Sequence, residues 1–217
     1  MRGLQGKVGV IAGGARGIGA AAARRLAEEG ASVVIGDMLV ELAEQVAADI
    51  RASGGKAFAV ALDGTDAASQ AAFVKAALDQ FGGLDLYHSN LAGGTEGDID
   101  ALNCPIEVLG AAAGGAAWQV AYPMTKNAIH ALARHVAQKW GKQGIRANVI
   151  CPGLVLTEAA EAHLTDEYRA AGLKAVPHTR LGKPEDIAAA VTFLASEDGE
   201  WVNGQVWHVN GGTLKRD

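Results

Sequence analysis

The sequence predicts an α/β fold, in which a parallel sheet carries helices on both faces. Three observations lead to this prediction. Short runs rich in β-branched residues alternate with alanine-rich segments of helical periodicity. A glycine-rich stretch separates the first β-branched run from the first helical segment. The length of 217 residues suits one domain with a substantial core.

The expected elements alternate along most of the chain and are bounded by ordinary start and stop signals. The first helix ends at Gly30, Asp66 is placed to cap the third helix, and Pro184 opens the last. No internal repeat or linker interrupts the pattern, so residues 1–217 are expected to form a single domain. Strands are expected at residues 7–12, 32–35, 57–62, 84–89, 146–151 and 205–209, and helices at 18–29, 39–53, 66–81, 123–140 and 184–194.

The composition argues against several classes of protein. The formal net charge is −5 without a basic run, so a polyanion such as DNA is not an expected partner. The two cysteines, Cys104 and Cys151, are too few and too far apart for a disulfide framework or a metal cluster. We expect free thiols in a reducing cytoplasm, because the N-terminus lacks a signal-peptide pattern and no apolar run is long enough to span a membrane.

The glycine-rich stretch at residues 13–19, GGARGIG, is suited to binding a dinucleotide. Glycines let the backbone approach a pyrophosphate closely, and the following helix offers free N–H groups at the positive end of its dipole. The spacing is G-x3-G-x-G rather than the commoner G-x-G-x-x-G. Its position between a strand and a helix favours cofactor binding over a purely structural turn.

An acidic residue at the end of the second strand favours NAD as the cofactor. Asp37 stands 18 residues after the last glycine of the motif, where a carboxylate can bind both hydroxyls of the NAD ribose and repels a 2′-phosphate. The next residue is Met38 and not an arginine, although Arg16 keeps NADP open as the alternative. Asp63 and Gly64 end the third strand, where a carboxylate can accept from the adenine amine or serve as a turn residue.

A tyrosine and a lysine later in the chain have the spacing of a proton-exchanging pair. Tyr122 and Lys126 are four residues apart on an expected helix, so they share a face, and Pro123 suits the first helical position. A lysine ammonium beside a phenol stabilises the phenolate and lowers its pKa. Such a tyrosine can exchange a proton with an alcohol or carbonyl oxygen, while hydride passes directly between substrate and nicotinamide.

Taken together, these motifs resemble those of the classical short-chain dehydrogenase/reductase family. The matching segments occur in the family's order and cover residues 5–93 and 118–213. Three positions within these motifs depart from the family pattern, because Ala12 replaces a threonine, Leu91 replaces the second asparagine and Asn210 replaces an aspartate. The matches are AGGARGIG (12–19) to TGxxxGxG, NLAG (90–93) to NNAG, YPMTK (122–126) to YxxxK, PGLVLT (152–157) to PGxVxT, RLGKPED (180–186) to RxGxPED and NGG (210–212) to DGG.

The resemblance implies a Rossmann-type doubly wound parallel sheet in a three-layer α/β/α arrangement. It implies an NAD-dependent oxidoreductase that interconverts a secondary alcohol and a ketone, works as a homodimer or homotetramer, and carries a substrate lid at residues 154–180. In this resemblance Tyr122 is the acid/base, and Lys126 holds the ribose and tunes Tyr122. The implied cofactor contacts are Gly13, Arg16, Gly17, Ile18, Gly19, Asp37, Asp63, Gly64, Asn90, Ala92, Gly93, Tyr122, Lys126, Pro152, Gly153, Val155 and Thr157.

One family residue has no counterpart in this sequence. The family places a serine that orients the substrate oxygen on the fifth strand; the corresponding position here is Leu109, and no serine occurs from Asn90 to Ala195. Only 31 residues, 91–121, separate the fourth strand from the tyrosine helix, and six of them are glycines. We expect the fourth helix and fifth strand to be shortened, with 106–109 as a short strand and Asn103 as one candidate for the family's helix asparagine.

Three explanations of the missing serine stay open. The loop can supply another oxygen ligand, for which Thr95 is the nearest upstream hydroxyl. The protein can be a non-catalytic NAD-binding relic or interaction module. Alternatively, the working protein holds a segment that this sequence lacks, which a break in the backbone within residues 91–121 would indicate. The set of motifs favours an enzyme.

Overall fold

The computed structural model describes residues 1–91, 121–162 and 164–213. The chain divides into two compact units, the sheet unit and the helix unit. The candidate serine position Leu109, the short strand expected at 106–109, and the alternatives Asn103 and Thr95 all lie outside the described residues. The sheet unit comprises Met1–Asn90, Ile150–Trp201 and His208–Asp217. The helix unit comprises Leu91–Val149 and Val202–Trp207.

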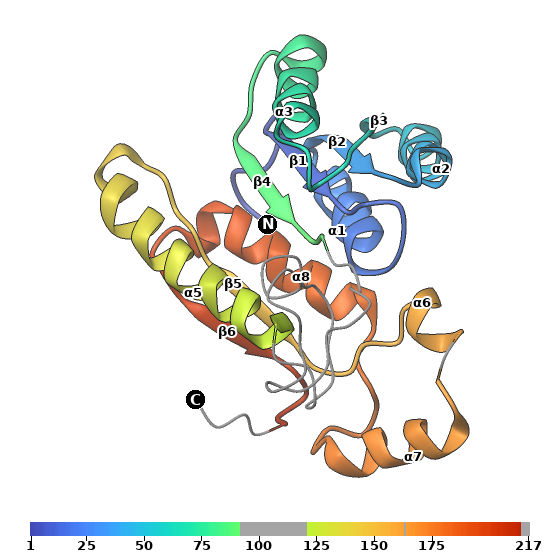
Figure 1. The fold of residues 1–217 in the computed structure, drawn as a ribbon. Coiled ribbons are helices and arrows are strands. Elements are labelled where there is room, and N and C mark those ends of the chain that lie inside the picture. The colour runs from blue at the N-terminus through green and yellow to red at the C-terminus, as the bar shows by residue number, and fades with distance from the viewer. Residues whose placement is uncertain (92–120, 163, 214–217) are drawn as a thin grey trace. The chain divides into compact units, whose positions relative to one another are not determined.

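The sheet unit is built on a parallel four-stranded sheet with the strand order β3-β2-β1-β4 (Figure 1). The chain moves outward from β1 through β2 to β3 and then returns to the other side of β1, which creates a switch point between β1 and β4. This arrangement confirms the expected Rossmann-type α/β fold. The strands are β1 (Val8–Ala12), β2 (Ser32–Asp37), β3 (Lys56–Ala61) and β4 (Leu86–Ser89), and the crossover helices are α1 (Gly17–Glu28), α2 (Val40–Ala52) and α3 (Ala67–Phe81).

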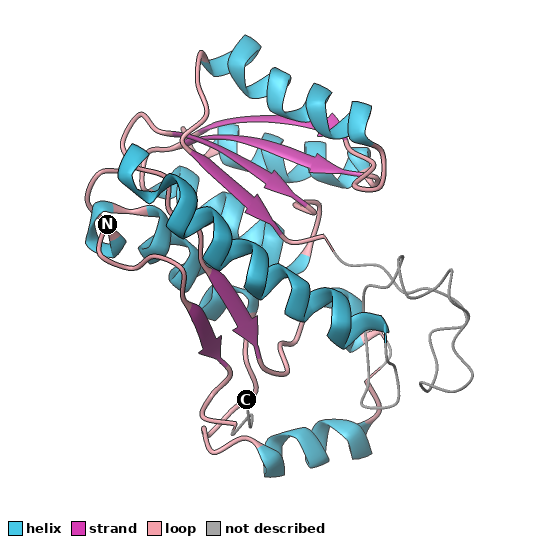
Figure 2. Cartoon of the chain, turned by 60° about the vertical axis from the view of Figure 1, so that its left-hand side comes forward, coloured by secondary structure: helices cyan, strands magenta, loops and turns pink. Residues whose placement is uncertain are grey.

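Helices cover both faces of this sheet because its strands are apolar on both sides (Figure 2). Ile11, Val33 and Ile35 are fully buried and belong to the cluster that contains the apolar residues of α1 and α2. Neighbouring strand residues point the opposite way. On that face a Cβ atom at Gly36 would lie 2.7 Å from the ring of the fully buried Phe73 of α3. Helix α3 therefore packs tightly over the carboxyl end of β2.

The C-terminal helix α8 (Pro184–Ala195) joins the first face of the sheet unit. Its buried residues Ile187 and Val191 belong to the same cluster as Ala20 and Ala23 of α1. The alanines of α1 are small, so the two helices can approach closely over a long contact. Residues near the two ends of the chain are thus held in one core.

The remaining elements include two α-helices and two short 3-10 helices that the sequence did not predict. The segment 154–180, expected to be a lid, contains the helices α6 and α7, and each is preceded by a threonine whose side chain caps the helix. Strands β5 and β6 pair with each other in a second sheet. These elements are α5 (Ala121–Trp140), η1 (Gly141–Gln143), β5 (Val149–Pro152), α6 (Glu158–Glu161), α7 (Asp166–Ala175), η2 (Glu197–Gly199) and β6 (Val206–Val209).

Four expected boundaries were wrong by two residues or more. Strand β2 ends at Asp37 rather than at residue 35, β4 begins at Leu86 rather than at residue 84, and the starts of α5 and β5 also differ. The helix expected to start at Pro123 begins at Ala121, so the proline stands inside its first turn, where the N–H has no intrahelical acceptor in any case. The strand expected from Arg146 begins at Val149. Arg146 lies before the strand, and its guanidinium donates a hydrogen bond to the Val202 carbonyl at 3.2 Å.

The turn between β1 and α1 depends on a close backbone approach at Gly19. A Cβ atom on Gly19 would lie 2.0 Å from the Gly13 carbonyl oxygen and 3.0 Å from the Gly14 Cα. Both contacts are with backbone, which cannot rotate away as a side chain would. Helix α1 can therefore start directly against the end of β1 only because residue 19 has no side chain.

Replacing Gly19 by alanine is expected to destabilise the protein by roughly 1–3 kcal/mol, the usual cost of inserting a methyl group into closely packed structure. Urea unfolding measures the effect. Gly83→Ala is the matched control, because a Cβ atom there would meet nothing within 4 Å and its backbone has no positive φ. Equal unfolding midpoints for Gly19→Ala and Gly83→Ala would contradict the tight approach.

An ion pair fixes the entry into α8. Two guanidinium N–H groups of Arg180 donate to the two carboxylate oxygens of Asp186, at 2.6 and 2.8 Å. The same carboxylate accepts the Lys183 backbone N–H at 2.7 Å. The hydrogen bond from Arg180 is the main reason why the pKa of Asp186 falls from 3.8 to about 2. The carboxylate therefore stays ionised and holds the first turn of the helix.

The Asp186→Asn variant is expected to lose stability near neutral pH, by less than about 1 kcal/mol because both partners are partly solvated. The folded-state pKa is depressed, so the stabilisation is present above about pH 4 and disappears as the pH falls toward 2. Urea midpoints at about pH 7 and about pH 3 test this. The gap between wild type and variant should shrink at the lower pH; a gap independent of pH would contradict the assignment.

Candidate functional site

The glycine-rich turn after β1 is fixed to both neighbouring strands. The N–H groups of Gly13 and Gly14 donate to the Gly36 carbonyl of β2, at 2.8 and 3.3 Å. On the other side, the Asn90 side chain donates to the Gly13 carbonyl at 3.1 Å. Gly13 has a φ of 81°, which favours glycine. The turn is therefore held rigidly at the carboxyl edge of the sheet, beside the switch point.

Asp37 stands at the end of β2 and faces this turn. One of its carboxylate oxygens accepts the Ala15 N–H and the other accepts the Leu39 N–H, both at 3.0 Å. Each oxygen keeps a further lone pair. The carboxylate is thus oriented by backbone and can still accept two hydroxyl groups, as a ribose diol requires. Arg16 is exposed at the N-cap of α1, and Met38 is largely exposed.

The segment after β5 reaches the beginning of α1. The Gly17 N–H donates to the Glu158 carboxylate at 3.1 Å. A Cβ atom at Gly17 would lie 3.1 Å from the methyl group of Thr157, and Gly17 has a φ of 57°. The structure places Thr157, an expected cofactor contact, beside Gly17 of the glycine-rich turn. Its contact with a cofactor stays a prediction. Glu158 was not expected: its only sequence signal was its place directly after the PGLVLT segment.

The start of that segment is packed against backbone. A Cβ atom at Gly153 would lie 2.9 Å from the Asn210 Cα, so this position also requires glycine. Val155 is buried in the core of the sheet unit. The Leu156 N–H donates to the Gly182 carbonyl at 2.8 Å, which joins the segment to the RLGKPED motif. The residues 152–157 are thus fixed by their own contacts.

Asp63 serves as a turn residue, one of the two roles that the sequence left open. Its carboxylate accepts the Thr65 hydroxyl at 2.7 Å and the Thr65 N–H at 2.8 Å. These hydrogen bonds lower the pKa of Asp63. The Gly64 carbonyl accepts the Gln70 side chain at 3.2 Å. Contact of Asp63 with an adenine amine stays a prediction.

The helix unit carries the expected tyrosine–lysine pair on α5. Tyr122 lies in the first turn and Lys126 follows one turn later. The Lys126 ammonium lies 3.4 Å from the Leu91 carbonyl, and burial lowers its pKa. Leu91 directly follows Asn90, so this lysine reaches the NLAG motif. Ala92, Gly93 and the Tyr122 side chain lie outside the described part of the structure.

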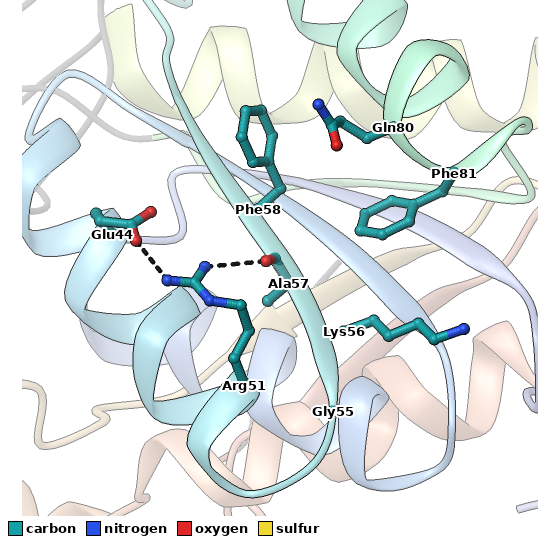
Figure 3. A pocket seen from close by; sticks show the side chains of 8 residues that line it. All are labelled: Glu44, Arg51, Gly55, Lys56, Ala57, Phe58, Gln80 and Phe81. Carbon is teal, nitrogen blue, oxygen red and sulfur yellow. Dashed lines mark hydrogen bonds and ion pairs between the residues drawn. The ribbon is translucent and has the colours of Figure 1, made fainter.

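Two further features of the sheet unit do not belong to this site. An open hollow of about 530 Å³ lies where β3 begins, with Phe58 and Phe81 on its wall (Figure 3). It is at the opposite end of the strands from the carboxyl edge, where ligands of parallel sheets bind. There the Arg51 guanidinium donates hydrogen bonds to the Ala57 carbonyl and to the Glu44 carboxylate.

The second feature is His88 on β4. Burial lowers the pKa of His88 to about 4, so its imidazole is neutral at physiological pH.

In 1–91, 121–162 and 164–213, no group of three or more His, Cys, Asp or Glu side chains is placed to hold a metal ion. Within the same ranges, no helix has the length and apolarity needed to cross a membrane.

Comparison with known proteins supports the sequence motifs. A short chain dehydrogenase model matches residues 7–104, and an Enoyl-(Acyl carrier protein) reductase model matches residues 104–213. The chain is 32% identical to a 7alpha-hydroxysteroid dehydrogenase of Clostridium sardiniense, over 98% of this chain and 95% of that protein. It is 35% identical to the dehydrogenase LinX of Sphingobium indicum, over 96% of each. The crystal structure of a hydroxysteroid dehydrogenase from Escherichia coli superimposes with a TM-score of 0.83 at 30% identity, covering 96% of this chain and 97% of that chain.

These alignments also show a difference in length. The alignment with the clostridial enzyme has 248 positions but contains only 98% of a 217-residue chain, so about 35 positions have no residue here. The two family models meet at residue 104, inside the short span 91–121. The ordered motifs, the parallel sheet and the full-length matches agree. The chain therefore belongs to the short-chain dehydrogenase/reductase family, whose members are nicotinamide-dependent oxidoreductases.

Proposed function

We propose that this protein interconverts a secondary alcohol and a ketone, with NAD as its cofactor and Tyr122 as the acid/base. The observation that carries the proposal is the glycine turn, held rigid by Gly36 and Asn90, with the Asp37 carboxylate fixed beside it. A rigid turn at a helix N-terminus is suited to a pyrophosphate. The relatives named above act on hydroxysteroids and on a chlorinated cyclohexadiene diol, which makes a cyclic secondary alcohol the first substrate class to test.

In this proposal the glycine turn binds the cofactor, and Tyr122 and Lys126 carry out the proton transfer. When bound, the nicotinamide gives or takes the hydride. Tyr122 gives a proton to the carbonyl oxygen in reduction and takes one from the hydroxyl in oxidation. The Lys126 ammonium is partly buried, which strengthens its field on a neighbouring phenol and favours the phenolate. By the family resemblance, Pro152, Gly153, Val155 and Thr157 would line the nicotinamide.

The preference for NAD over NADP rests on Asp37. Its two oxygens are already aimed by the Ala15 and Leu39 N–H groups, so little ordering is needed to accept a ribose diol. A 2′-phosphate would instead place two negative charges side by side. Arg16 is the basic residue that offers NADP an alternative, but it lies at the helix N-cap and the Asp37 carboxylate lies between the turn and α2.

Because the family serine is missing, another group must orient the substrate oxygen. Thr95 is one candidate ligand, and the segment that the relatives have and this sequence lacks is another source. The relatives' extra length of about 35 positions favours the second. The non-catalytic alternative has no comparison in its favour. We further propose that residues 1–217 act as one catalytic domain, in a homodimer or homotetramer, in the cytoplasm.

The Tyr122→Phe variant is expected to lose alcohol oxidation by roughly 10²–10⁴-fold while still binding NADH, because only the proton-transferring hydroxyl is removed. Steady-state rates and NADH fluorescence titration measure the two effects. Tyr87→Phe is the control, since the Tyr87 hydroxyl bonds to Gln70 in the sheet unit. The assay uses protein whose intact mass matches 22.2 kDa, so that turnover belongs to this sequence. Undiminished turnover in Tyr122→Phe would exclude the proposed role.

Replacing Asp37 by serine together with Met38 by arginine is expected to reverse the cofactor preference. The change removes the carboxylate that repels a 2′-phosphate and adds a guanidinium that binds one. The ratio of kcat/KM for NAD to that for NADP should fall by at least about tenfold. Met38→Ala alone is the control and should keep the wild-type preference. A wild-type protein that already prefers NADP would refute the assignment of NAD.

A further inference from the structure

Glu158 occupies a position at the cofactor turn where an anion of the cofactor would bind. Its carboxylate accepts the Gly17 N–H at 3.1 Å. Gly17 is the first residue of α1, so its N–H has no acceptor within the helix and lies at the positive end of the helix dipole. A carboxylate oxygen and a pyrophosphate oxygen are the same kind of ligand for such a group, because both are anionic acceptors.

The position of Glu158 is set by the local structure and is not that of a free surface side chain. Thr157 packs its methyl group toward Gly17, and its hydroxyl caps α6 by accepting the Ala160 N–H at 3.1 Å. Glu158 is the first residue of that helix. The capped helix thus presents the carboxylate to the start of α1.

The same turn binds a second carboxylate in a different place. The Ala15 N–H donates to Asp37, while the Gly17 N–H donates to Glu158. Asp37 lies at the edge where a ribose is expected, and its charge is compatible with hydroxyl groups. Glu158 lies at the helix N-terminus, where the cofactor brings its own negative charge. A carboxylate and a pyrophosphate are both negative and repel each other, so Glu158 and a pyrophosphate cannot both accept the Gly17 N–H.

We propose that Glu158 is an intramolecular competitor of the cofactor's pyrophosphate. It holds the Gly17 N–H in the free protein and leaves it when the dinucleotide binds. The apparent affinity for the cofactor is then the intrinsic affinity multiplied by the fraction of molecules in which Glu158 has left the turn. This inference rests on the proposed function, because it requires that the turn binds a dinucleotide. It also couples cofactor binding to the start of α6.

The test compares cofactor binding by Glu158→Ala, Glu158→Gln and Glu167→Gln, using calorimetry with NADH, ADP-ribose and adenosine. Glu158→Ala should bind NADH and ADP-ribose about tenfold more tightly than wild type, because the competitor is gone. Adenosine, which carries no phosphate, should bind all variants equally. Glu158→Gln should lie in between, since its amide oxygen can accept the N–H without a charge. Glu167→Gln is the control for charge, being exposed on the neighbouring helix α7.

The outcomes separate this inference from the proposed function. Unchanged or weaker NADH binding in Glu158→Ala overturns the competitor role and leaves the proposed function intact. Equal tightening for adenosine also overturns it, because the effect would then not depend on phosphate. If neither wild type nor Glu158→Ala binds NADH, the proposed function fails together with the inference. Urea midpoints confirm that every variant is folded before its binding is compared.

Discussion

The backbone junction between β1 and α1 is the constraint on which the rest of the sheet unit depends. Gly19 lies so close to the Gly13 carbonyl that no side chain fits, and the N–H groups of Gly13 and Gly14 are fixed on the Gly36 carbonyl. This junction sets where α1 begins and therefore where its free N–H groups point. Because α8 packs along the alanines of α1, the position of the C-terminal helix follows from the same junction.

The electrostatics of the site follow from this geometry. A helix N-terminus attracts anions, and in the free protein two carboxylates, Asp37 and Glu158, bind the N–H groups of one turn. In the proposed function Asp37 would face the hydroxyl groups of a ribose and could stay in place, whereas Glu158 would face phosphate and would have to leave. The attraction that suits the turn to a phosphate thus also draws the protein's own carboxylates to it.

The sequence was a good guide where a residue's role is local. The glycine positions, the Asp66 cap, the Pro184 start of α8 and the acidic end of β2 could all be predicted, since each depends on neighbouring backbone. The helices α6 and α7 were missed because they are short and their threonine caps were not weighed. The start of β5 was placed too early because the contacts of Arg146 with residue 202 are distant in sequence. The serine question depends on a span outside the described residues.

By itself, the sequence determined the α/β class, the cofactor turn, the Asp37 carboxylate and the spacing of Tyr122 and Lys126. Periodicity and motif spacing record these features directly, because each depends on residues that are close together in the sequence. Only the tertiary structure decided that Asn90 fixes the Gly13 carbonyl, that Thr157 reaches Gly17, and that Glu158 binds its N–H. Those contacts join residues 77 to 141 positions apart, and the chain's path between them is set by packing rather than by any local pattern.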